Sequence, residues 1–464
     1  MMGRQRIAVI GGVASGTAAA AEARRLDPDA QIVLFEQYAE ISYGACEIPL
    51  FLAGTVKDPN QLIAFTPERF EEERGVSVQA LTRVDRLDAQ SGMLEFTSSV
   101  DGETRKAKFD KFILATGARA VSPDLPGVNA ENVFTVRDLQ DAISLETYIS
   151  DTVIQHAVVV GGGFVGIEVA ESLTHRGIRV TMLQPTPGPL HVHLENDMAL
   201  LVAELLEKGG VTVRDERMAR LEASSDSRVN AVRTVSGEMV GCQLVILAMG
   251  IIPNVELGVE AGVKIGDTGA FRVNDRMRTN LANVWACGDC VEVERVIDGR
   301  SVISPLSLTA FKTGRVAGRN AARRGAHKPA RFEGVVAAQG VKVFDGEVAY
   351  LGLTKSVAQE SGFSAATVTI RHRTKGALVP ESRFIHVTLV FETFRGRILG
   401  AQLVGGPGTV LRANTLIPLI RKGATVSDLY EQDLIYAPPF SPRLDPLLVA
   451  ARKAIRSLEG RRTT

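Results

Sequence analysis

Short, uninterrupted apolar runs, separated by glycine turns and helix-forming stretches, set the pattern of the first part of the chain. Residues 7–10 are all apolar, as in a strand that helices cover on both faces. Residues 18–26 are alanine-rich and favour a helix, and residues 31–35 form a second strand-like run. The same order recurs with an apolar run, a helix and a strand expected at 157–160, 164–176 and 178–183. This repetition predicts two α/β units on one chain.

The first unit carries the signs of a dinucleotide-binding turn. Gly11, Gly12 and Gly16 follow its first strand directly, with Val13 in place of the middle glycine of the usual pattern. Glu36 ends its second strand, about twenty residues further on, where a carboxylate accepts hydrogen bonds from the adenosine ribose. The start of the helix, with its free N–H groups, is then expected to receive the pyrophosphate.

The second unit has the complete glycine pattern, at Gly161, Gly163 and Gly166. Its second strand ends in Gln184, where an acid normally favours NADH, so we predict use of both nicotinamide cofactors with a modest preference for NADH. Two nucleotide units imply two dinucleotides. The chemistry natural to that pair is hydride transfer between a nicotinamide and a flavin.

Length and charge narrow the class of protein. A chain of 464 residues is long enough for roughly three domains. Lys+Arg and Asp+Glu are both 53, and this balance argues against a nucleic-acid partner. No apolar run approaches the roughly eighteen residues that a membrane span needs, and too few apolar residues precede Gly11 for a secretory signal. We therefore predict a cytoplasmic protein that does not bind membranes.

Four cysteines are present, and their spacing does not suggest a disulfide framework. Cys46 lies between Ser42 and Pro49, where a loop would run over the cofactor of the first unit. Cys242 lies in a strand-like context and is expected to pack in the core. Cys287 and Cys290 have the two-residue gap of a redox or metal pair, and that alternative has to be weighed.

The last segment, from about Phe332, has no glycine pattern. Strands are expected at 347–351, 366–370, 384–391 and 397–404, and helices near 354–361, 409–422 and 445–458. Since it carries no cofactor motif, its predicted role is contact, either between subunits or with substrate.

Five motifs in this order resemble the flavin-dependent pyridine nucleotide-disulfide oxidoreductases. They are the two glycine patterns, Ala115-Thr116-Gly117, Met249-Gly250-Ile251-Ile252-Pro253-Asn254 and Ala286-Cys287-Gly288-Asp289. The resemblance covers essentially the whole chain. It implies an α/β fold of two Rossmann-like dinucleotide-binding domains, as in glutathione reductase, plus a C-terminal α/β dimerisation domain. The implied boundaries are 1–119 and 246–325 for the FAD domain, 120–245 for the NAD(P) domain and 326–464 for the C-terminal domain.

The same resemblance implies which residues contact the cofactors. FAD is assigned to Gly11, Gly12, Gly16, Glu36 and Asp289, and NAD(P)H to Gly161, Gly163 and Gly166, with Glu168 near the nicotinamide. Further cofactor positions in the matching motifs are Ala115, Thr116, Gly117, Gly250 and Gly288. Because Asp289 is needed at the flavin, chemistry at the flanking Cys287 and Cys290 is disfavoured, and no metal site is predicted.

Within this family the single-cysteine branch fits best. Ser42, Cys46 and Pro49, the Thr66-Pro67-Glu68 helix start and the Tyr436-Ala437-Pro438-Pro439 segment look like coenzyme A-disulfide reductases and the related NADH oxidases and persulfide reductases. This resemblance implies an NAD(P)H-dependent reductase of a disulfide, persulfide or polysulfide that works through Cys46, with coenzyme A among the candidate partners. Four positions differ from the residues usual in this branch: Ala45, Glu47, Leu50 and Val379. These differences leave the identity of the sulfur substrate undecided.

Two further expectations concern Cys46 and its surroundings. A helix end or the flavin edge can lower the pKa of its thiol. In the resembling reductases the tyrosine at the position of Tyr436 comes from the second subunit, which predicts a homodimer with a shared site. The competing interpretation is an NADH oxidase, or a flavoprotein that passes electrons to another acceptor, in which Cys46 is not catalytic and Tyr436 is only a packed aromatic side chain.

Overall fold

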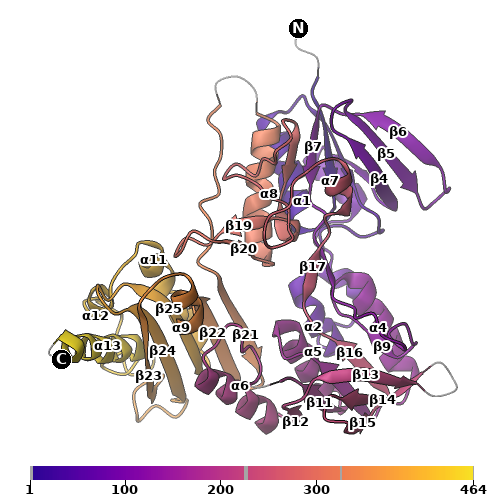
Figure 1. Ribbon diagram of the computed structural model, residues 1–464. Helices are drawn as coiled ribbons and strands as arrows, with labels where there is room; N and C mark the ends of the chain where they lie inside the picture. The colour runs from indigo at the N-terminus through magenta and orange to yellow at the C-terminus, as the bar shows by residue number, and fades with distance from the viewer. Residues whose placement is uncertain (1–3, 186, 224–227, 324–326, 463–464) are drawn as a thin grey trace.

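The computed structural model describes residues 4–185, 187–223, 228–323 and 327–462. Figure 1 shows three regions: the first unit above, the second unit below it, and the C-terminal region to one side. The first unit contains a parallel five-stranded sheet in the order β18-β7-β1-β2-β3. Its strands are β1 (Arg6–Ile10), β2 (Gln31–Phe35), β3 (Ser77–Gln79), β7 (Lys111–Leu114) and β18 (Val284–Ala286).

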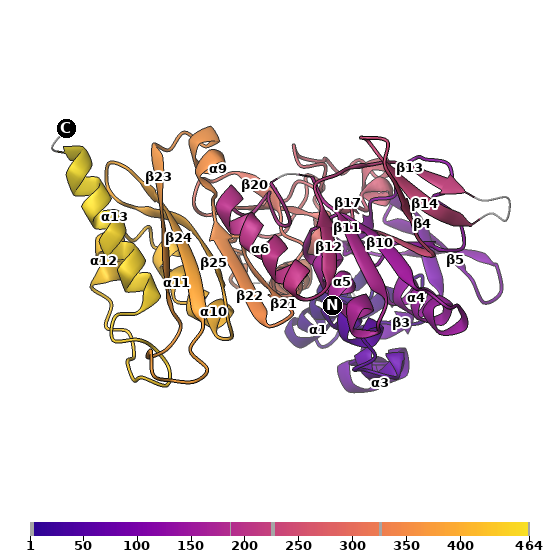
Figure 2. The same cartoon turned by 90° about the horizontal axis from the view of Figure 1, so that it is seen from below.

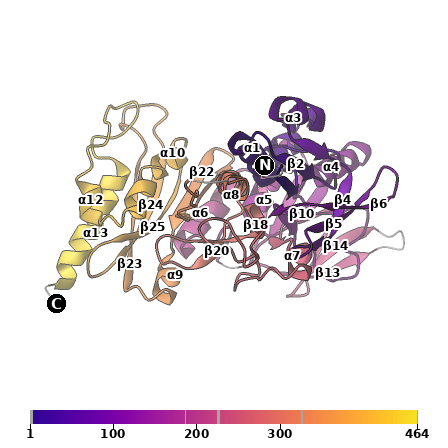
Figure 3. The ribbon, with the colours of Figure 1, turned by 90° about the horizontal axis from the view of Figure 1, so that it is seen from above.

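Helices α1 (Ala14–Leu26) and α8 (Ser307–Ala321) pack against each other beside this sheet, as the view from above in Figure 3 also shows. Their close approach depends on two glycines of α8. A Cβ at Gly314 or Gly318 would overlap the backbone of α1 at Ser15 or Ala19. The first unit is therefore completed by a segment that follows the second unit in sequence.

The second unit repeats the arrangement with a parallel sheet in the order β12-β11-β10-β16-β9. The strands are β9 (Val133–Phe134), β10 (His156–Val160), β11 (Arg179–Leu183), β12 (Val211–Arg214) and β16 (Leu244–Leu247). The helices are α4 (Leu139–Asp151), α5 (Phe164–His175) and α6 (Asn196–Lys208). Every residue of β10 is buried, in keeping with its apolar sequence.

Smaller antiparallel sheets and short helices flank and connect these two parallel sheets. Antiparallel layers are formed by β4 (Thr82–Asp88), β5 (Met93–Ser98) and β6 (Thr104–Lys108), by β13 (Met218–Ala223), β14 (Val229–Thr234) and β15 (Met239–Gly241), and by β19 (Glu292–Glu294) and β20 (Ser301–Ile303). The chain passes between the units through the paired strands β8 (Ala118–Ala120) and β17 (Ile251–Pro253). Three short helices are α2 (Ile48–Leu52), α3 (Pro67–Arg74) and α7 (Glu256–Glu260).

The C-terminal region is an antiparallel sheet in the order β21-β22-β25-β24-β23. Its strands are β21 (Ala338–Val343), β22 (Gly346–Gly352), β23 (Ala365–Arg373), β24 (Phe384–Glu392) and β25 (Ile398–Gly405). Its helices are α9 (Lys355–Glu360), α10 (Thr409–Ala413), α11 (Leu416–Arg421), α12 (Val426–Tyr430) and α13 (Pro446–Arg462). Figure 2 shows α6 between this sheet and the rest of the second unit. The hydrophobic core of the second unit continues into four valines of the C-terminal sheet: Val341, Val343, Val348 and Val404.

The predicted α/β class and its C-terminal domain are confirmed, but one predicted helix is wrong. Residues 409–422 form two short helices, α10 and α11, instead of one. Pro418 explains the break, because proline has no N–H to donate to the carbonyl of Asn414 and its ring would collide with that group in a continuous helix. Starting a new helix at Leu416 places Pro418 in the first turn, where no donor is needed.

The predicted domain boundaries remain predictions. The whole of β16, which spans the boundary between residues 245 and 246, pairs within the second sheet. The boundary between residues 325 and 326 lies outside the described residues. Among the residues that the structure describes, no helix combines the length and apolar character required to cross a bilayer.

Candidate functional site

The first glycine turn joins β1 to α1 and fits closely against the neighbouring strands. Gly11 has a φ of +108°, and a Cβ there would overlap the carbonyl oxygen of Ala115. A Cβ at Gly16 would overlap the carbonyl of Gly11. The N–H of Gly12 donates to Oε2 of Glu36 at 2.7 Å. The structure therefore brings these five predicted cofactor residues together at one end of the sheet.

Burial raises the pKa of Glu36, and backbone N–H groups, including that of Gly12, act in the opposite direction. A buried carboxylate is stable only when donors satisfy it, so the hydrogen bonds from Gly12 and Tyr38 are its necessary partners. A ribose diol would add further donors to the same oxygens. The residues present thus fit the adenosine end of a dinucleotide.

The predicted cofactor residues after β7 and β16 lie where the chain crosses between the units. Thr116 Oγ1 donates to the carbonyl of Asn254 at 2.6 Å, and Asn254 Nδ2 donates back to the carbonyl of Thr116 at 2.9 Å. Gly117 and Gly250 both have positive φ, at +65° and +111°. This reciprocal pair joins the two segments of chain that cross between the units, next to the paired strands β8 and β17.

Asp289 and Gly288 follow β18 and face the first glycine turn. A Cβ at Gly288 would overlap the hydroxyl of Ser15 in α1. The carboxylate of Asp289 forms an ion pair with Arg137, whose Nε also donates to the carbonyl of Ala118 at 3.0 Å. An arginine from the loop before α4 thus holds the carboxylate of Asp289 just after the end of β18.

The second glycine turn uses the same contacts. Gly161 has a φ of +107°, and a Cβ at Gly166 would overlap its carbonyl. The N–H of Gly162 donates to Oε1 of Gln184 at 2.7 Å. A Cβ at Gly163 would meet no atom within 4 Å, so this position is open to a ligand. The second turn therefore fits a dinucleotide as well as the first.

Cys46 lies in a single 3₁₀ turn, Ala45–Glu47, that leads into α2, and its side chain is exposed. Contrary to the expected lowering, the pKa of its thiol is raised, first by partial burial and then by the carboxylates of Glu168, Asp289 and Glu47. Arg137 is the neighbouring group that lowers it. Partial burial and the neighbouring carboxylates therefore favour the protonated thiol.

Glu168 comes from α5 of the second unit, which packs against α2. Ser172 Oγ, one helical turn further on, donates to the carbonyl of Pro49 at 2.9 Å and so joins the two helices. Burial, together with the charge of Glu171, raises the pKa of Glu168 to about 7. Cys46 therefore lies beside an acid that can be protonated at neutral pH.

Arg137 is the site residue that sequence reasoning missed. It directly precedes Asp138, the N-cap of α4, and its own N–H donates to Oδ2 of Asp141 at 2.9 Å. The capping signal could have located the helix start. A lone arginine before a helix has no pattern of its own, and only the fold shows that it reaches Asp289.

The remaining cysteines are buried and lie away from solvent. Burial raises the pKa of Cys242 to about 12, consistent with a core residue. The thiol of Cys290 contacts the carbonyl of Cys287 at 3.2 Å, and both thiols have raised pKa values because they are buried. Within the described part of the chain, no group of three or more His, Cys, Asp or Glu side chains could hold a metal ion.

Tyr436 is about half exposed, in the loop between α12 and α13. This loop is tied to the β23–β24 loop, because the N–H of Gly376 donates to the carbonyl of Pro438 at 2.9 Å. Arg412 of α10 reinforces the contact through the carbonyls of Thr374 and Phe440. All of these partners belong to the C-terminal region, so the contacts of Tyr436's loop do not join it to Cys46 of the same chain.

Comparison with known proteins agrees with this arrangement. Residues 5–314 match the model of the pyridine nucleotide-disulphide oxidoreductase family, and residues 338–447 match its dimerisation domain. The chain is 34% identical to an NAD(P)H coenzyme A polysulfide/persulfide reductase of Pyrococcus horikoshii, over 97% of this chain and 98% of that one. It is 32% identical to an NADH oxidase of Methanocaldococcus jannaschii, over 98% and 100% of the two chains.

A solved structure gives the same picture. The NAD-dependent persulfide reductase from A. fulgidus superposes with a TM-score of 0.94 at 32% identity. The match covers 98% of this chain and 84% of that one. The similarity therefore extends over both nucleotide units and the C-terminal region together.

Proposed function

Because the chain belongs to the pyridine nucleotide-disulphide oxidoreductase family, we propose that it uses NAD(P)H to reduce a disulfide, persulfide or polysulfide at Cys46. At the coarser level it is an FAD-dependent NAD(P)H oxidoreductase of the group that contains coenzyme A-disulfide reductases, persulfide reductases and NADH oxidases. The finer assignment, to a sulfur substrate, is the proposal.

One observation carries the proposal. The carboxylates of Asp289 and Glu168 both raise the pKa of the exposed Cys46 thiol. Asp289 belongs to the first predicted cofactor site, and Glu168 lies in the helix that follows the glycine turn of the second predicted site. A solvent-reachable thiol at the junction of two dinucleotide sites is placed to exchange electrons with one and substrate with the other. A cysteine that served only for packing would need none of these features.

The residues suit a simple thiol exchange. The first glycine turn, Glu36 and Asp289 would hold FAD, which would supply the two electrons taken from NAD(P)H. The Cys46 thiolate attacks one sulfur of the substrate's S–S bond, which breaks and releases the other sulfur as a thiolate. Glu168, protonated in part near pH 7, is placed to supply a proton to that product. Return of two electrons to the mixed disulfide then restores the Cys46 thiolate and frees the second thiol.

The names of the relatives support a sulfur substrate. The Pyrococcus horikoshii relative is named a coenzyme A polysulfide/persulfide reductase, and several staphylococcal relatives are named coenzyme A disulfide reductases. Coenzyme A, as a thiol or a mixed disulfide, is therefore a candidate partner. The name of the Pyrococcus horikoshii relative also includes NAD(P)H.

A second candidate function is oxygen reduction or electron transfer without participation of the cysteine. The raised pKa of Cys46 favours it, because a protonated thiol is a poor nucleophile at neutral pH. The Methanocaldococcus jannaschii relative, which is named an NADH oxidase, is about as similar to this chain in sequence as the Pyrococcus horikoshii relative is. In that case reduced flavin would react with an acceptor directly and Cys46 would be dispensable.

Steady-state NAD(P)H oxidation against a panel of acceptors separates the two functions. The panel contains coenzyme A disulfide, polysulfide, glutathione disulfide, a quinone and oxygen. Cys46→Ser is expected to abolish turnover of the sulfur substrates while NAD(P)H still reduces the flavin. Cys242→Ala, which removes a buried thiol elsewhere, is the matched control and should keep both activities. Full sulfur turnover in Cys46→Ser would establish the second function.

We also infer a homodimer in which Tyr436 completes the partner's site. The match to the dimerisation domain supports association. A surface of exposed apolar side chains lies on α10 and on the two loops that Arg412 ties together, and its members are Leu378, Leu411, Ile435, Tyr436 and Phe440. Such a surface is typical of an interface. A phenol brought beside Cys46 could hydrogen-bond the departing thiolate.

Subunit mixing tests the shared site. Inactive Cys46→Ser and Tyr436→Phe subunits, mixed where subunits exchange, should regain activity, because a heterodimer assembles one intact site. Phe440→Tyr, on the same surface, is the control for a generally altered loop. A monomer in sedimentation, or a fully active Tyr436→Phe enzyme, rules the shared site out.

A further inference from the structure

Three aromatic rings meet where helix α5 begins, directly after the second glycine turn. Phe164 is the first residue of α5 and follows Gly163. The ring centroid of Tyr350, from strand β22 of the C-terminal region, lies 5.9 Å from that of Phe164, and the ring centroid of His193 lies 5.8 Å from it. His193 and Tyr350 are stacked, with their ring centroids 4.2 Å apart and an angle of 10° between the ring planes. The start of α5 therefore contacts both a loop of its own unit and the C-terminal region.

The segment that carries His193 is attached to the same glycine turn. The N–H of Leu190 donates to the carbonyl of Gly162 at 2.9 Å, and the N–H of His193 donates to the carbonyl of Leu190 at 2.8 Å. Burial, and then the charge of His191, lower the pKa of His193 to about 4. The imidazole is therefore neutral near pH 7 and stacks on Tyr350 as an uncharged ring.

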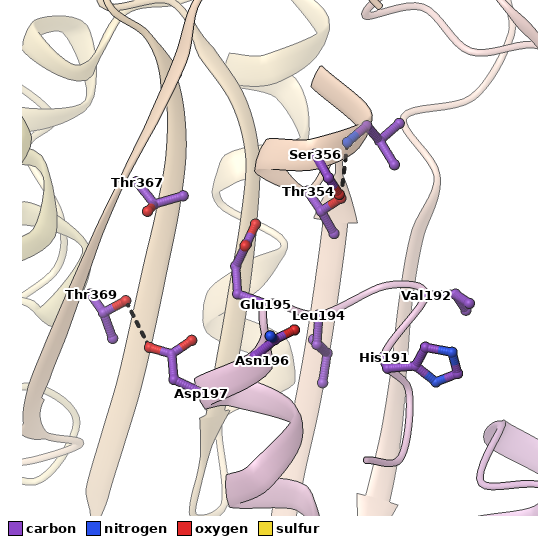
Figure 4. A pocket seen from close by; sticks show the side chains of 11 residues that line it. His191, Val192, Leu194, Glu195, Asn196, Asp197, Thr354, Ser356, Thr367 and Thr369 are labelled. Atoms are coloured by element: carbon purple, nitrogen blue, oxygen red, sulfur yellow. Dashed lines mark hydrogen bonds between the residues drawn. The ribbon is translucent and has the colours of Figure 1, made fainter. Parts of the chain in front are cut away.

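A little further along the chain, the same segment is anchored to the C-terminal sheet. The N–H of Glu195 donates to Oε1 of Gln402 at 2.7 Å. At the start of α6, Oγ1 of Thr369 donates to Oδ2 of Asp197 at 3.4 Å, and Figure 4 draws this hydrogen bond across the groove between the two regions. His193 is therefore held between the glycine turn on one side and the C-terminal sheet on the other.

Tyr350 is fixed from within the C-terminal sheet. It lies opposite Gln339 in the antiparallel pair of β22 and β21, and its hydroxyl donates to Oε1 of Gln339 at 3.3 Å. The side chain is partly buried, and burial raises the pKa of its phenol. Because the hydroxyl is engaged by its own sheet, the contact of Tyr350 with the second unit is made by its ring.

The later part of α5 has separate anchors. Glu171 accepts the N–H of Phe344 at 2.8 Å and forms an ion pair with Lys342, both in the β21–β22 hairpin. The part of α5 that is next to Cys46 is joined to α2 by the hydrogen bond from Ser172. The three rings therefore act on the start of the helix, and the rest of the helix does not depend on them.

The start of α5 is where a nucleotide pyrophosphate is expected to bind. Its N-cap, Gly163, makes no side-chain hydrogen bond, so the first N–H groups of the helix are left for a ligand. A Cβ at Gly163 would meet no atom within 4 Å. Hydrogen bonds weaken steeply when their distance or angle departs from the optimum, so a contact that fixes Phe164 also fixes these donors.

From these contacts we propose that Tyr350 and His193 are positioning residues for the nicotinamide cofactor, because they clamp Phe164 and so hold the free N–H groups of α5 where the pyrophosphate binds. The C-terminal region then contributes to the second dinucleotide site of its own chain, in addition to any contact between subunits. The inference rests on the proposed function only in that the second unit takes NAD(P)H.

Binding of ADP-ribose to the FAD-loaded protein, measured by calorimetry, tests this clamp without turnover, since ADP-ribose carries the pyrophosphate but cannot reduce the flavin. Tyr350→Leu should weaken binding about threefold to tenfold, the loss expected for one aromatic pair. Tyr350→Phe keeps the ring and should restore an affinity within about twofold of the wild type. Tyr148→Leu removes a partly buried ring that packs on Phe134 elsewhere in the second unit, and it is the matched control that should leave binding unchanged.

His193→Leu tests the stack from the second unit and leaves the C-terminal sheet unaltered. It should weaken ADP-ribose binding by a similar factor. The double variant with Tyr350→Leu should bind no more weakly than the weaker single variant, because both changes remove the same support from Phe164. The pH midpoint of Cys46 alkylation should not move in any of these variants, since Ser172 holds the part of α5 next to Cys46.

Each contrary result overturns the proposal. An unchanged affinity in Tyr350→Leu would show that the ring does not support the site, and an equal loss in Tyr350→Phe would show that the hydroxyl matters instead. A shift of the Cys46 midpoint together with the loss of affinity would mean that the substitutions undock the C-terminal region as a whole. ADP-ribose contains no reducible sulfur. Loss of sulfur reduction with the ADP-ribose effects intact would therefore refute only the proposed function, and the reverse result would refute only the clamp.

Discussion

The two glycine turns of this protein are built alike and differ in what surrounds them. Gly11 and Gly161 have φ values of +108° and +107°. The N–H groups of Gly12 and Gly162 donate to Glu36 and Gln184, both at 2.7 Å. A Cβ at Gly16 or Gly166 would overlap the carbonyl of the first glycine of its turn. In each unit the first glycine faces an alanine carbonyl, from Ala115 or Ala248. The backbone expected to receive a pyrophosphate thus occurs twice in the chain with nearly the same contacts.

The surroundings of the turns have diverged. Residues that follow the second unit in sequence pack against the helix after the first turn. Gly314 of α8 and Gly288 both contact Ser15 of α1. The second turn has no such cover at Gly163, whose missing Cβ would point into open space. We infer from this difference that the first site retains its cofactor and that the second exchanges one. This division is what a flavoprotein that turns over a nicotinamide cofactor requires.

The largest expected effect comes from adding a methyl group to the first glycine of either turn. Gly11→Ala combines an unfavourable positive φ with overlap at Ala115, a strain of about 1–3 kcal/mol or more. We expect purified Gly11→Ala protein to lack most of its flavin. Gly161→Ala should keep its flavin and lose flavin reduction by NAD(P)H. The ratio of flavin to protein absorbance and anaerobic reduction measure the two effects.

A matched control is available at Gly102. It has a φ of +72° in a surface turn, and a Cβ there would meet no atom within 4 Å. Gly102→Ala should therefore change stability slightly and leave both cofactor functions intact. If Gly161→Ala lost flavin as completely as Gly11→Ala, the division of labour between the two turns would be wrong.

A smaller effect is expected at the ends of the second strands. Glu36→Gln keeps an acceptor for the N–H of Gly12 but removes the charge that strengthens hydrogen bonds to a ribose. We expect the affinity for FAD to fall by about tenfold, or about 1.4 kcal/mol. Reconstitution of the apoprotein, followed by quenching of flavin fluorescence, gives the dissociation constant. An unchanged affinity would show that Glu36 only supports the glycine turn.

The sequence predicted the repeated part of this architecture well because local rules govern it. Apolar runs, glycines and the terminal Glu36 or Gln184 are close together in sequence, so their spacing alone defines the turn. The helix start at Thr66 is a further local success, since its Oγ1 accepts the N–H of Arg69 and Gly75 ends the helix with a left-handed φ.

The environment of Cys46 could not be predicted in the same way. Its pKa is raised first by partial burial and then by the charges of Glu168 and Asp289. Both acids are far from Cys46 in sequence and reach it only through the packing of α5 on α2 and the return of the chain at β18. Arg137 was missed for the same reason. The homodimer role of Tyr436 depends on a second chain, so it stays a prediction.

The smallest expected effects separate the contributions of the two units to Cys46. Glu168, from the second unit, raises the pKa of Cys46, and Arg137, which pairs with Asp289 of the first, lowers it. Glu168→Gln should therefore shift the pH midpoint of Cys46 alkylation by iodoacetamide downward, and Arg137→Gln should shift it upward, each by about half to one unit. Mass spectrometry of the Cys46 peptide from FAD-loaded protein gives both midpoints.

Glu168→Gln should also alter stability in a defined pH window. The pKa of Glu168 is about 7 in the folded protein, above the value of about 4.3 expected for the unfolded chain. The folded state then binds the extra proton between these values, so the charged carboxylate costs stability fully above pH 7 and not at all below about pH 4. Glu168→Gln should gain about 1–3 kcal/mol at pH 8, seen as a higher melting temperature, and nothing near pH 4. Glu47→Gln, which removes an exposed carboxylate beside Cys46, is the control. A gain that persisted unchanged at pH 4 would mean that the charge of the Glu168 carboxylate is not what lowers stability. It would also argue against Glu168 as the charge from the second unit that raises the pKa of Cys46.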